Sequence, residues 1–559
     1  MTPLSERFVT VEGELRGRII QNFGRLHDRI YRAGMAGLPP CCSPGWPGDW
    51  EGRALLALIH DSESLHCEAA YIGELIAWIR SLMNDEGYRS EPNDKLDLTD
   101  INEQMHSSHN WLLRALMACY RRTGDAAFRD EAAAILRNLY LPIRPHLIHY
   151  PKTAQERAVL SDKAVIGHFV GHHREWRLSG DTGCIFMCFD ALGEAWDLFR
   201  EEPLHGEIGR LIDTLLDAFR HMDYVGSGLQ THATLTCMRG LMRVYRVRRD
   251  PAILADIERC FADYLAYGMT ATYENINNFA GAVHTEPCAI VDSYMLACQL
   301  WEETGNTAYL ACSHKIWWSA LMRTQRANGG FGCDWPEEDG VLRVVPSFYE
   351  AYWCCSMRGA EGLGYPVRHA LYRENNTLTM PFYFDFTASL PGLGTIGVAT
   401  DYPASGRVTV TVRDGNGGEA SMRFYLAPWM KEPRVTCGGE TISHTVEDDF
   451  LTVPIRFEAG KAYLFSFRQT LTAVPCERYW HAGKGLSTLE YGPSALGCDP
   501  AFDGVVDPGA LIPDGRGGFS DGKTVFEPLY RDNRLPQEEN TALERRILFR
   551  AAPGASLLP

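Results

Sequence analysis

The sequence predicts a multidomain α+β protein in which an (α/α)6 barrel is followed by a C-terminal β-sandwich. Two observations support this fold class. Before about residue 365, amphipathic helical segments are joined by short corners of recurring sequence, and after it they give way to short β-rich segments. The chain has 559 residues, which is too long for one hydrophobic core and predicts several domains.

The N-terminal segment is predicted to be helical. Between residues 7 and 32 apolar side chains recur at helical spacing, for example Leu15, Ile19 and Phe23. Residues 34–48 are rich in Pro and Gly, which predicts a long loop. Helical spacing resumes after Asp49.

Four similar corners indicate helical hairpins. Each begins with Tyr or Trp and ends with Asp or Asn, and they occupy residues 120–125, 176–181, 245–250 and 301–306. A Gly in such a corner can end one helix, and the Asp or Asn can cap the next. With roughly a dozen helical segments before residue 364, the pattern suits a closed ring of hairpins. We therefore expect the barrel over residues 1–365.

The C-terminal part is predicted to consist of strands. Short β-rich segments separated by Gly, Pro, Asp and Asn occur at residues 377–380, 408–412, 422–426, 450–453 and 463–467. This pattern predicts a β-sandwich over residues 366–490. Residues 491–559 contain much Gly and Asp, and we expect loops and a few strands that complete or add to the sandwich.

Composition restricts the partners. The net charge of −17 argues against nucleic acid and against an anionic membrane surface, and favours a neutral or cationic ligand. The N-terminus lacks the apolar run of a secretory signal, and no stretch is long enough to span a bilayer, so we expect a cytoplasmic protein. The 17 cysteines are scattered and odd in number, which indicates thiols and metal ligands and not a disulfide framework. Whether the chain forms a homodimer stays open.

Candidate metal ligands gather between residues 273 and 355. Glu286 and Cys288 form a Glu-x-Cys pair, and Cys354 and Cys355 are adjacent. Zn²⁺ takes four ligands tetrahedrally, prefers sulfur and nitrogen, and also accepts carboxylate oxygen. Our hypothesis is that these four residues bind zinc, that one thiolate is a nucleophile, and that Glu274, just upstream, is the acid/base.

A purely structural interpretation of these residues is also open. Free cysteine is among the most buried residue types, and an adjacent pair often fills a core. Cys41-Cys42 is such a pair without a Glu-x-Cys partner, and Cys333 is a further thiol that could mimic a ligand. Glu274 on its own suits a solvated acid in a polar loop.

A series of motifs resembles glycoside hydrolase family 127, the β-L-arabinofuranosidases, and its relatives. In order along the chain the motifs are Asp49-Trp50, Asn84-Asp85-Glu86-Gly87-Tyr88, Ser108-His109-Asn110, Thr285-Glu286-Pro287-Cys288-Ala289, Trp353-Cys354-Cys355, Leu426-Ala427-Pro428-Trp429, Cys437-Gly438-Gly439-Glu440, Leu451-Thr452-Val453-Pro454 and Leu489-Glu490-Tyr491-Gly492-Pro493. They are scattered over most of the chain.

The resemblance implies a zinc-dependent retaining glycosidase on an (α/α)6 barrel with β-sandwich domains behind it. The family's zinc ligands correspond to Glu286, Cys288, Cys354 and Cys355, and its nucleophile to Cys354. Glu274 is the nearest match to the family's acid/base, although its spacing to Glu286 is shorter than usual. Family histidines that contact the sugar correspond to His109, His168 and His232.

The chemistry is consistent with these residue types. Glycoside hydrolysis usually requires two carboxyl groups, and here a thiolate would replace the attacking one. A metal-bound thiol is deprotonated, so zinc could supply the nucleophile without a base. The resemblance, with which this chemistry agrees, implies an exo-acting hydrolase that removes a terminal furanose, such as β-L-arabinofuranose, from an oligosaccharide with retention of configuration.

Two alternatives stay open. A sugar epimerase on the same ring would move protons with histidines such as His109 and His232, and its activity would survive chelators and Cys354→Ser. A non-catalytic glycan-binding protein with a structural zinc would bind without turnover and unfold when the metal is removed.

Overall fold

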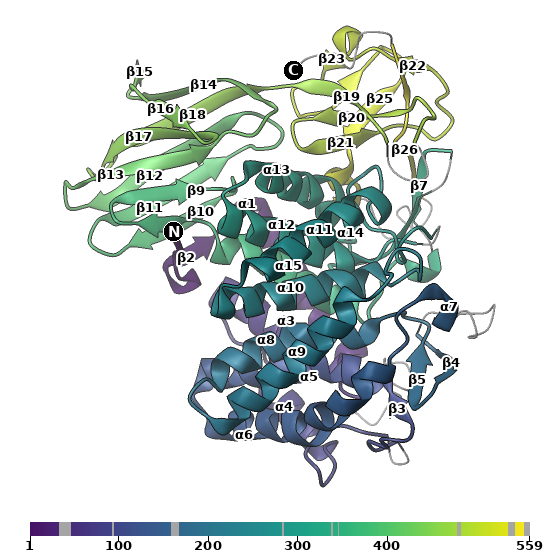
Figure 1. The fold of residues 1–559 in the computed structure, drawn as a ribbon. Helices are drawn as coiled ribbons and strands as arrows, with labels where there is room; N and C mark the ends of the chain where they lie inside the picture. Colours follow the sequence, from purple (N-terminus) through teal and green to yellow (C-terminus); the bar gives the residue numbers. More distant parts are fainter. Residues whose placement is uncertain are drawn as a thin grey trace.

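The computed structural model combines a helical region with a strand-rich C-terminal region (Figure 1). It describes residues 1–32, 46–91, 94–157, 167–281, 284–336, 339–344, 346–477, 482–534 and 543–552. The predicted loop at 34–48 and the pair Cys41-Cys42 therefore lie largely outside the described residues.

Six inner helices contact one another in a closed cycle. In this cycle each helix contacts the next and the last contacts the first: α3 (Asp49–Leu65), α5 (Glu103–Thr123), α8 (Cys188–Leu198), α10 (Thr231–Arg248), α12 (Pro287–Thr304) and α15 (Cys355–Arg368). They are buried on nearly every side; α5, for example, is buried continuously from Glu103 to Cys119. A helix without an exposed face must be covered by other elements.

Outer helices cover the inner ones. Each packs against an inner helix, and α1 packs against two of them, α3 and α15. The outer helices are α1 (Gly13–Leu26), α4 (Ile72–Ser81), α6 (Ala126–Ile135), α9 (Pro203–Arg220), α11 (Pro251–Tyr267) and α13 (Thr307–Lys315). Shorter helices are α2 (Arg29–Arg32), α7 (Ala154–Arg157) and α14 (Met322–Thr324). The hairpins thus place one helix of each pair inside and one outside.

Three of the four predicted corners join helices as expected. Gly124 and Gly305 adopt the left-handed conformation after α5 and α12, and Asp125 and Asn306 accept hydrogen bonds from the first turns of α6 and α13. Asp250 caps α11 in the same way. The fourth prediction is wrong: residues 176–179 form a strand, because Trp176 and Leu178 bury their side chains in a small sheet and not along a helix.

Two large sheets lie at one end of the molecule (Figure 1). The first contains β1 (Thr2–Pro3), β8 (Tyr372–Glu374), β9 (Thr377–Met380), β13 (Glu419–Tyr425), β17 (Phe450–Arg456) and β16 (Thr445–Glu447), in that order. The second contains β15 (Glu440–Thr441), β14 (Met430–Cys437), β18 (Ala462–Gln469), β12 (Arg407–Gly415), β11 (Gly394–Thr400), β10 (Phe386–Leu390) and β2 (Val9–Val11). The sheets pack together, since Phe424 of β13 stacks on Phe465 of β18 with ring centroids 4.8 Å apart.

The N-terminus differs from the prediction. Residues 9–11 are strand β2 and not helix, and α1 begins only at Gly13. Val9 and Val11 are buried and Thr10 is exposed, an alternation that suits a β-strand. Strands β1 and β2 thus lie at edges of the two large sheets, beside β8 and β10.

A third sheet occupies most of the C-terminal part. Its order is β19 (Leu471–Pro475), β20 (Ser487–Tyr491), β21 (Ser494–Gly497), β25 (Val525–Pro528), β24 (Phe519–Ser520) and β23 (Ile512–Pro513). It has hydrophobic clusters separate from the main core. Smaller pairings join β22 (Val505–Val506) to β27 (Arg550–Ala551), β26 (Glu544–Arg546) to β7 (Val341–Val344) and β6 (Asp334–Pro336), and β3 (Ile101–Asn102) to β5 (Trp176–Ser179) and β4 (Phe169–His173).

None of the helices in the described ranges combines the length and the apolar character that crossing a membrane requires.

Candidate metal centre

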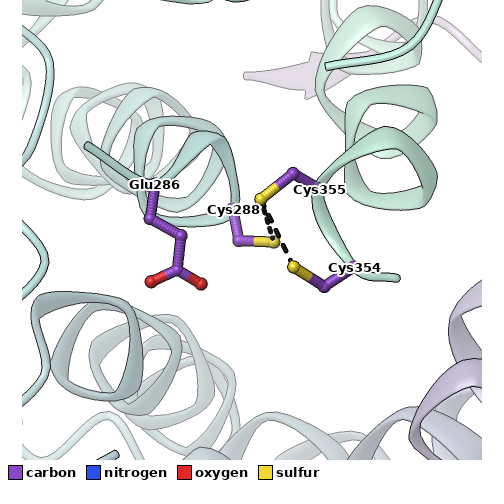
Figure 2. A group of neighbouring side chains, drawn as sticks. All are labelled: Glu286, Cys288, Cys354 and Cys355. Carbon is purple, nitrogen blue, oxygen red and sulfur yellow. Dashed lines mark hydrogen bonds between the residues drawn. The ribbon is translucent and has the colours of Figure 1, made fainter. Parts of the chain in front are cut away.

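The four predicted ligands come together at the N-terminal ends of two inner helices. Glu286 occupies the N-cap position of α12 and Cys288 lies in its first turn, while Cys354 occupies the N-cap position of α15 and Cys355 begins that helix. Their ligand atoms all lie within 4.8 Å of one another (Figure 2). Helix N-termini carry partial positive charge, so both helices favour ionised thiols and carboxylate at this point.

The three sulfur atoms are close enough to share protons. The Sγ atom of Cys355 lies 3.4 Å from that of Cys288 and 3.4 Å from that of Cys354. Cys288 and Cys355 are buried, whereas Cys354 is partly exposed. Cys354 is therefore the thiol that an incoming molecule reaches most easily.

Positive charge surrounds Cys288. The guanidinium of Arg53 lies 3.7 Å from its Sγ atom, and the imidazole of His232 is bonded to Glu286 at 3.0 Å. Burial would raise the pKa of the Cys288 thiol, but hydrogen bonds from Cys354 and Cys355 and the charges of His232 and Arg53 hold it well below its usual value. Burial also disfavours the imidazolium, yet Glu286 and Cys288 raise the pKa of His232 to about 10.

The donor set fits a soft divalent cation. Three thiol sulfurs and one carboxylate oxygen can complete a tetrahedral shell, the arrangement that Zn²⁺ prefers. The four ionised ligands with a divalent cation would leave two negative charges. Arg53 and His232 stand beside the ligands and can balance them.

The cluster opens onto a cavity of about 530 Å³. The described residues that line it are Trp46, Asp49, Arg53, Gly167, Asp181, Met187, Gln230, His232, Asn277, His284, Glu286, Cys333, Phe348, Ala351, Trp353, Cys354 and Cys355. Aromatic and sulfur-containing side chains line this cavity together with charged and polar side chains. A cavity of this size and lining suits a small polar molecule with apolar faces, such as a sugar.

Of the three predicted histidines, only His232 lines the cavity. His232 lines the cavity and bonds Glu286. His109 is not among the lining residues: its Nδ1 atom bonds the carbonyl of Met105 at 2.7 Å, and its Nε2 atom accepts from the backbone of Arg89. Burial lowers the pKa of His109 to about 3, so it is neutral. His168 is exposed, and only its neighbour Gly167 reaches the cavity.

Glu274 lies behind the cavity wall and is not among the lining residues. It is fully buried, and its carboxylate lies 4.0 Å from Arg323, which is itself paired with Asp334 at 2.9 Å. Burial, reinforced by the charge of Asp334, raises the pKa of Glu274 well above its usual value. Its position therefore does not support the acid/base role, which stays a prediction.

Sequence reasoning missed a carboxyl group on the cavity. Asp181 is buried, accepts a hydrogen bond from Gln230 Nε2 at 2.7 Å and another from the backbone of Gly167 at 2.6 Å. Burial and the nearby Glu286 raise the pKa of Asp181 to about 7. The only sequence signal is its place at the end of the corner 176–181, where the sequence predicts a helix cap.

A buried ionic network lies beneath the cluster. Asp292 joins His232 at 3.4 Å to Arg239 at 2.6 Å and to Arg358, and Arg239 continues to Glu361 at 2.9 Å. These side chains come from α10, α12 and α15. The network fixes the imidazole of His232, and through it Glu286.

Comparison with known proteins identifies the fold. No protein-family model and no curated protein matches the sequence. Among solved structures, a β-arabinofuranosidase of glycoside hydrolase family 127 matches with a TM-score of 0.69 at 11% identity, covering 100% of this chain and 98% of that one. A β-L-arabinofuranosidase of the same family from Geobacillus stearothermophilus T6 matches with a TM-score of 0.67 at 13% identity, covering 97% and 100%.

A further structure described as a glycoside hydrolase matches with a TM-score of 0.65 at 13% identity, covering 99% of this chain and 98% of the other. These matches extend over the helical region and all the sheets. They confirm, at the level of the fold, the resemblance first seen in scattered motifs. The chain thus has the fold of the family 127 glycoside hydrolases over its whole described length.

Proposed function

We propose that this protein is a zinc-dependent retaining glycoside hydrolase that removes a terminal furanose, such as β-L-arabinofuranose, from an oligosaccharide. The observation that carries the proposal is the cluster of Glu286, Cys288, Cys354 and Cys355 at the wall of a cavity of about 530 Å³. A metal shell that is wholly enclosed would serve structure alone. Here one ligand, Cys354, is partly exposed and lines the cavity.

Cys354 is assigned as the nucleophile. Its Sγ atom attacks the anomeric carbon from the face opposite the leaving oxygen while the bond to that oxygen breaks. Water later displaces the sulfur from the face that the leaving group has left, which gives net retention. Zinc bound by the four ligands would keep the thiol ionised at neutral pH. Without such help, the hydrogen bond with Cys288, together with burial, raises the pKa of the Cys354 thiol well above its usual value.

The substrate in this proposal is a neutral sugar. Two cations lie among the described residues of the cavity wall, and each is already paired: Arg53 with Asp49 at 2.9 Å, and His232 with Glu286 at 3.0 Å. Neither therefore has a free charge for an acidic sugar. The aromatic rings of Trp46, Phe348 and Trp353 offer apolar surfaces on which a sugar ring can pack.

The proposal includes the fold assignment made from the sequence. The cycle of six inner helices with six outer helices supports an (α/α)6 barrel over residues 1–365. The packed pair of sheets supports the predicted β-sandwich over residues 366–490 as far as Gln469, whereas β19 and β20 at the end of that range belong to the third sheet. Residues 491–559 then contribute strands to the third sheet.

The test combines metal content with hydrolysis. Wild type and Cys354→Ala are analysed by mass spectrometry for metal and assayed on a panel of aryl furanosides and pyranosides. We expect one zinc per wild-type chain and cleavage of a furanoside that falls by about 10³-fold or more in the variant.

Cys119→Ala is the matched control, because Cys119 is a buried thiol on α5 that is not part of the cluster. It should keep both metal and activity. Absence of zinc from wild type purified without chelators, or full activity of Cys354→Ala, would contradict the proposal.

The geometry disfavours an epimerase that uses His109 and His232 as its pair. His109 has both ring nitrogens bonded to backbone and does not line the cavity, so it cannot form a proton-transferring pair with His232 there. No observation favours a binding protein without catalysis.

A further inference from the structure

A retaining hydrolase needs a proton donor for the leaving group as well as a nucleophile. Among the residues that the structure describes, three carboxyl groups line the cavity: Asp49, Asp181 and Glu286. Asp49 is paired with the guanidinium of Arg53 at 2.9 Å. Glu286 belongs to the ligand cluster and is held by His232. Asp181 alone has neither an arginine partner nor a place among the ligands.

We propose that Asp181 is the catalytic acid/base, which protonates the leaving-group oxygen and then deprotonates the attacking water. The inference rests on the proposed function and replaces Glu274, the residue suggested by sequence, in this role. It rests on the position of Asp181 on the cavity wall and on the way its carboxyl group is held.

Three donors orient the Asp181 carboxyl group. Gly167 donates its backbone N–H to Oδ2 at 2.6 Å, Ser179 donates its hydroxyl to the same oxygen at 3.4 Å, and Gln230 donates from Nε2 to Oδ1 at 2.7 Å. The Ser179 oxygen in turn accepts the backbone N–H of Asp181 at 3.1 Å. Oδ1, which accepts only from Gln230 among the described residues, has a second lone pair that remains for a substrate oxygen or a water.

Gln230 also fixes the distance between Asp181 and the metal cluster. Its Nε2 atom lies 2.7 Å from Asp181 Oδ1 and 3.3 Å from Glu286 Oε2. By the sum of those two distances, the two carboxylate oxygens are at most 6.0 Å apart. Because the ligand atoms of Glu286 and Cys354 lie within 4.8 Å of one another, Asp181 lines the cavity near the nucleophile.

The two steps balance without any further reactant. In the first, the Cys354 sulfur bonds to the anomeric carbon, the carbon–oxygen bond breaks with its electron pair on oxygen, and the proton of Asp181 moves to that oxygen. In the second, the Asp181 carboxylate takes a proton from water, the water oxygen bonds to the anomeric carbon, and the electron pair of the carbon–sulfur bond returns to sulfur.

The test compares leaving groups. Wild type, Asp181→Asn and Glu274→Gln are assayed on two substrates. The first is a 2,4-dinitrophenyl furanoside, whose leaving group departs without being protonated. The second is an alkyl furanoside, whose leaving group must be protonated. For Asp181→Asn we expect kcat/KM on the alkyl furanoside to fall by about 10²–10⁴-fold, with a much smaller loss for the dinitrophenyl substrate. Glu274→Gln should keep the wild-type ratio between the two substrates.

Azide provides a second measurement that a merely structural residue would not affect. In Asp181→Asn and Asp181→Ala, azide should restore turnover of the dinitrophenyl furanoside and give a glycosyl azide of retained configuration. Metal content and melting temperature show that each variant is folded. Equal losses on both substrates without azide rescue, or leaving-group dependence appearing in Glu274→Gln, would overturn the assignment.

The two proposals fail in different ways. If wild type hydrolyses no furanoside, the proposed function fails and the role of Asp181 fails with it. If wild type is active through Cys354 and Asp181→Asn keeps the wild-type ratio of rates, only the role of Asp181 is wrong.

Discussion

At the scale of single residues, the charges around Cys288 depend on contacts that the sequence does not display. Arg53 reaches this thiol from a helix 235 positions earlier in the chain, and its guanidinium lies 3.9 Å from the ring of Trp111. The guanidinium of Arg358 lies 4.7 Å from the same ring. Trp111 also stacks on His232, so one aromatic side chain spaces the cations around the cluster.

The ligands themselves could be predicted because two short motifs contain all of them. Glu286-x-Cys288 and Cys354-Cys355 can be recognised in the sequence without a structure, because the two residues of each motif lie together at one helix N-terminus. Asp181 and Gln230 have no such local signature. Gln230 is 56 residues from Glu286, and only the folded ring brings their side chains within hydrogen-bonding distance.

Asp61 supplies a prediction about pH and stability. It is fully buried on α3, neither carboxyl oxygen has a hydrogen-bond partner among the described residues, and burial raises its pKa well above the usual value. Above about pH 4 the unfolded chain releases this proton while the folded chain keeps it, so rising pH destabilises the wild type. Asp61→Asn removes that effect.

We therefore expect the stability of Asp61→Asn relative to wild type to increase between pH 4 and pH 8, as measured by urea unfolding. Asp130→Asn, at an exposed position on α6, serves as the control and should show no such trend. A difference between Asp61→Asn and wild type that is independent of pH would contradict the prediction.

At the scale of elements, glycines set the distance between inner helices. A Cβ atom on Gly52 of α3 would lie 2.2 Å from the backbone nitrogen of Leu112 in α5. One on Gly240 of α10 would lie 2.2 Å from the backbone of Phe189 in α8. Since backbone atoms cannot move aside as a flexible side chain can, these two pairs of helices can pack so closely only with Gly at the contact.

Gly52→Ala should therefore lower the free energy of unfolding by about 1–3 kcal/mol, because α3 and α5 must separate. Gly17→Ala is the matched control: it lies within α1 with open space around it, and alanine should stabilise that helix by about 0.5–1 kcal/mol. Chemical denaturation of both variants tests the pair. Equal effects of the two substitutions would show that the close approach does not matter.

The elements also show where sequence patterns suffice. Corners with a Gly followed by Asp or Asn were predicted correctly at residues 120–125 and 301–306, because capping is a local interaction. The corner at 176–181 also ends in Gly followed by Asp, yet its first four residues form a strand. That strand pairs with residues 169–173 and 101–102. Tertiary pairing overrides the local signal there, and a single sequence does not reveal the pairing partner.

At the scale of the whole molecule, the N-terminal strands tie the first residues to the C-terminal sheets. Phe386 pairs with Val11 and Ala388 with Val9, while Thr2 pairs with Arg373. These strands cover sheet edges that would otherwise expose unpaired backbone groups. The sequence placed residues 7–32 in one helix, because a strand of three residues carries too little pattern to be recognised.

Deleting residues 2–11 should thus destabilise the two large sheets as well as the helical cycle. The deletion exposes the edges of β8 and β10 and removes three buried apolar side chains, Leu4, Val9 and Val11, each worth about 1.5–3 kcal/mol. We expect a loss of several kcal/mol in urea unfolding and faster proteolysis within residues 372–398.

Thr10→Ala is the control for this deletion, because Thr10 lies in the same strand with its side chain exposed. It should leave the unfolding curve close to that of wild type. A deleted chain with wild-type stability would show that the edge strands contribute nothing.

The position of these strands also sets an order of assembly on the ribosome. Their partners begin only at residues 372 and 386, after every inner helix has been synthesised. Domains generally fold as they emerge, so the helices can associate while the first residues still lack a partner. Pairing between segments so distant along the chain is slow to form. The residues that are synthesised first are consequently among the last to form their native strand pairs.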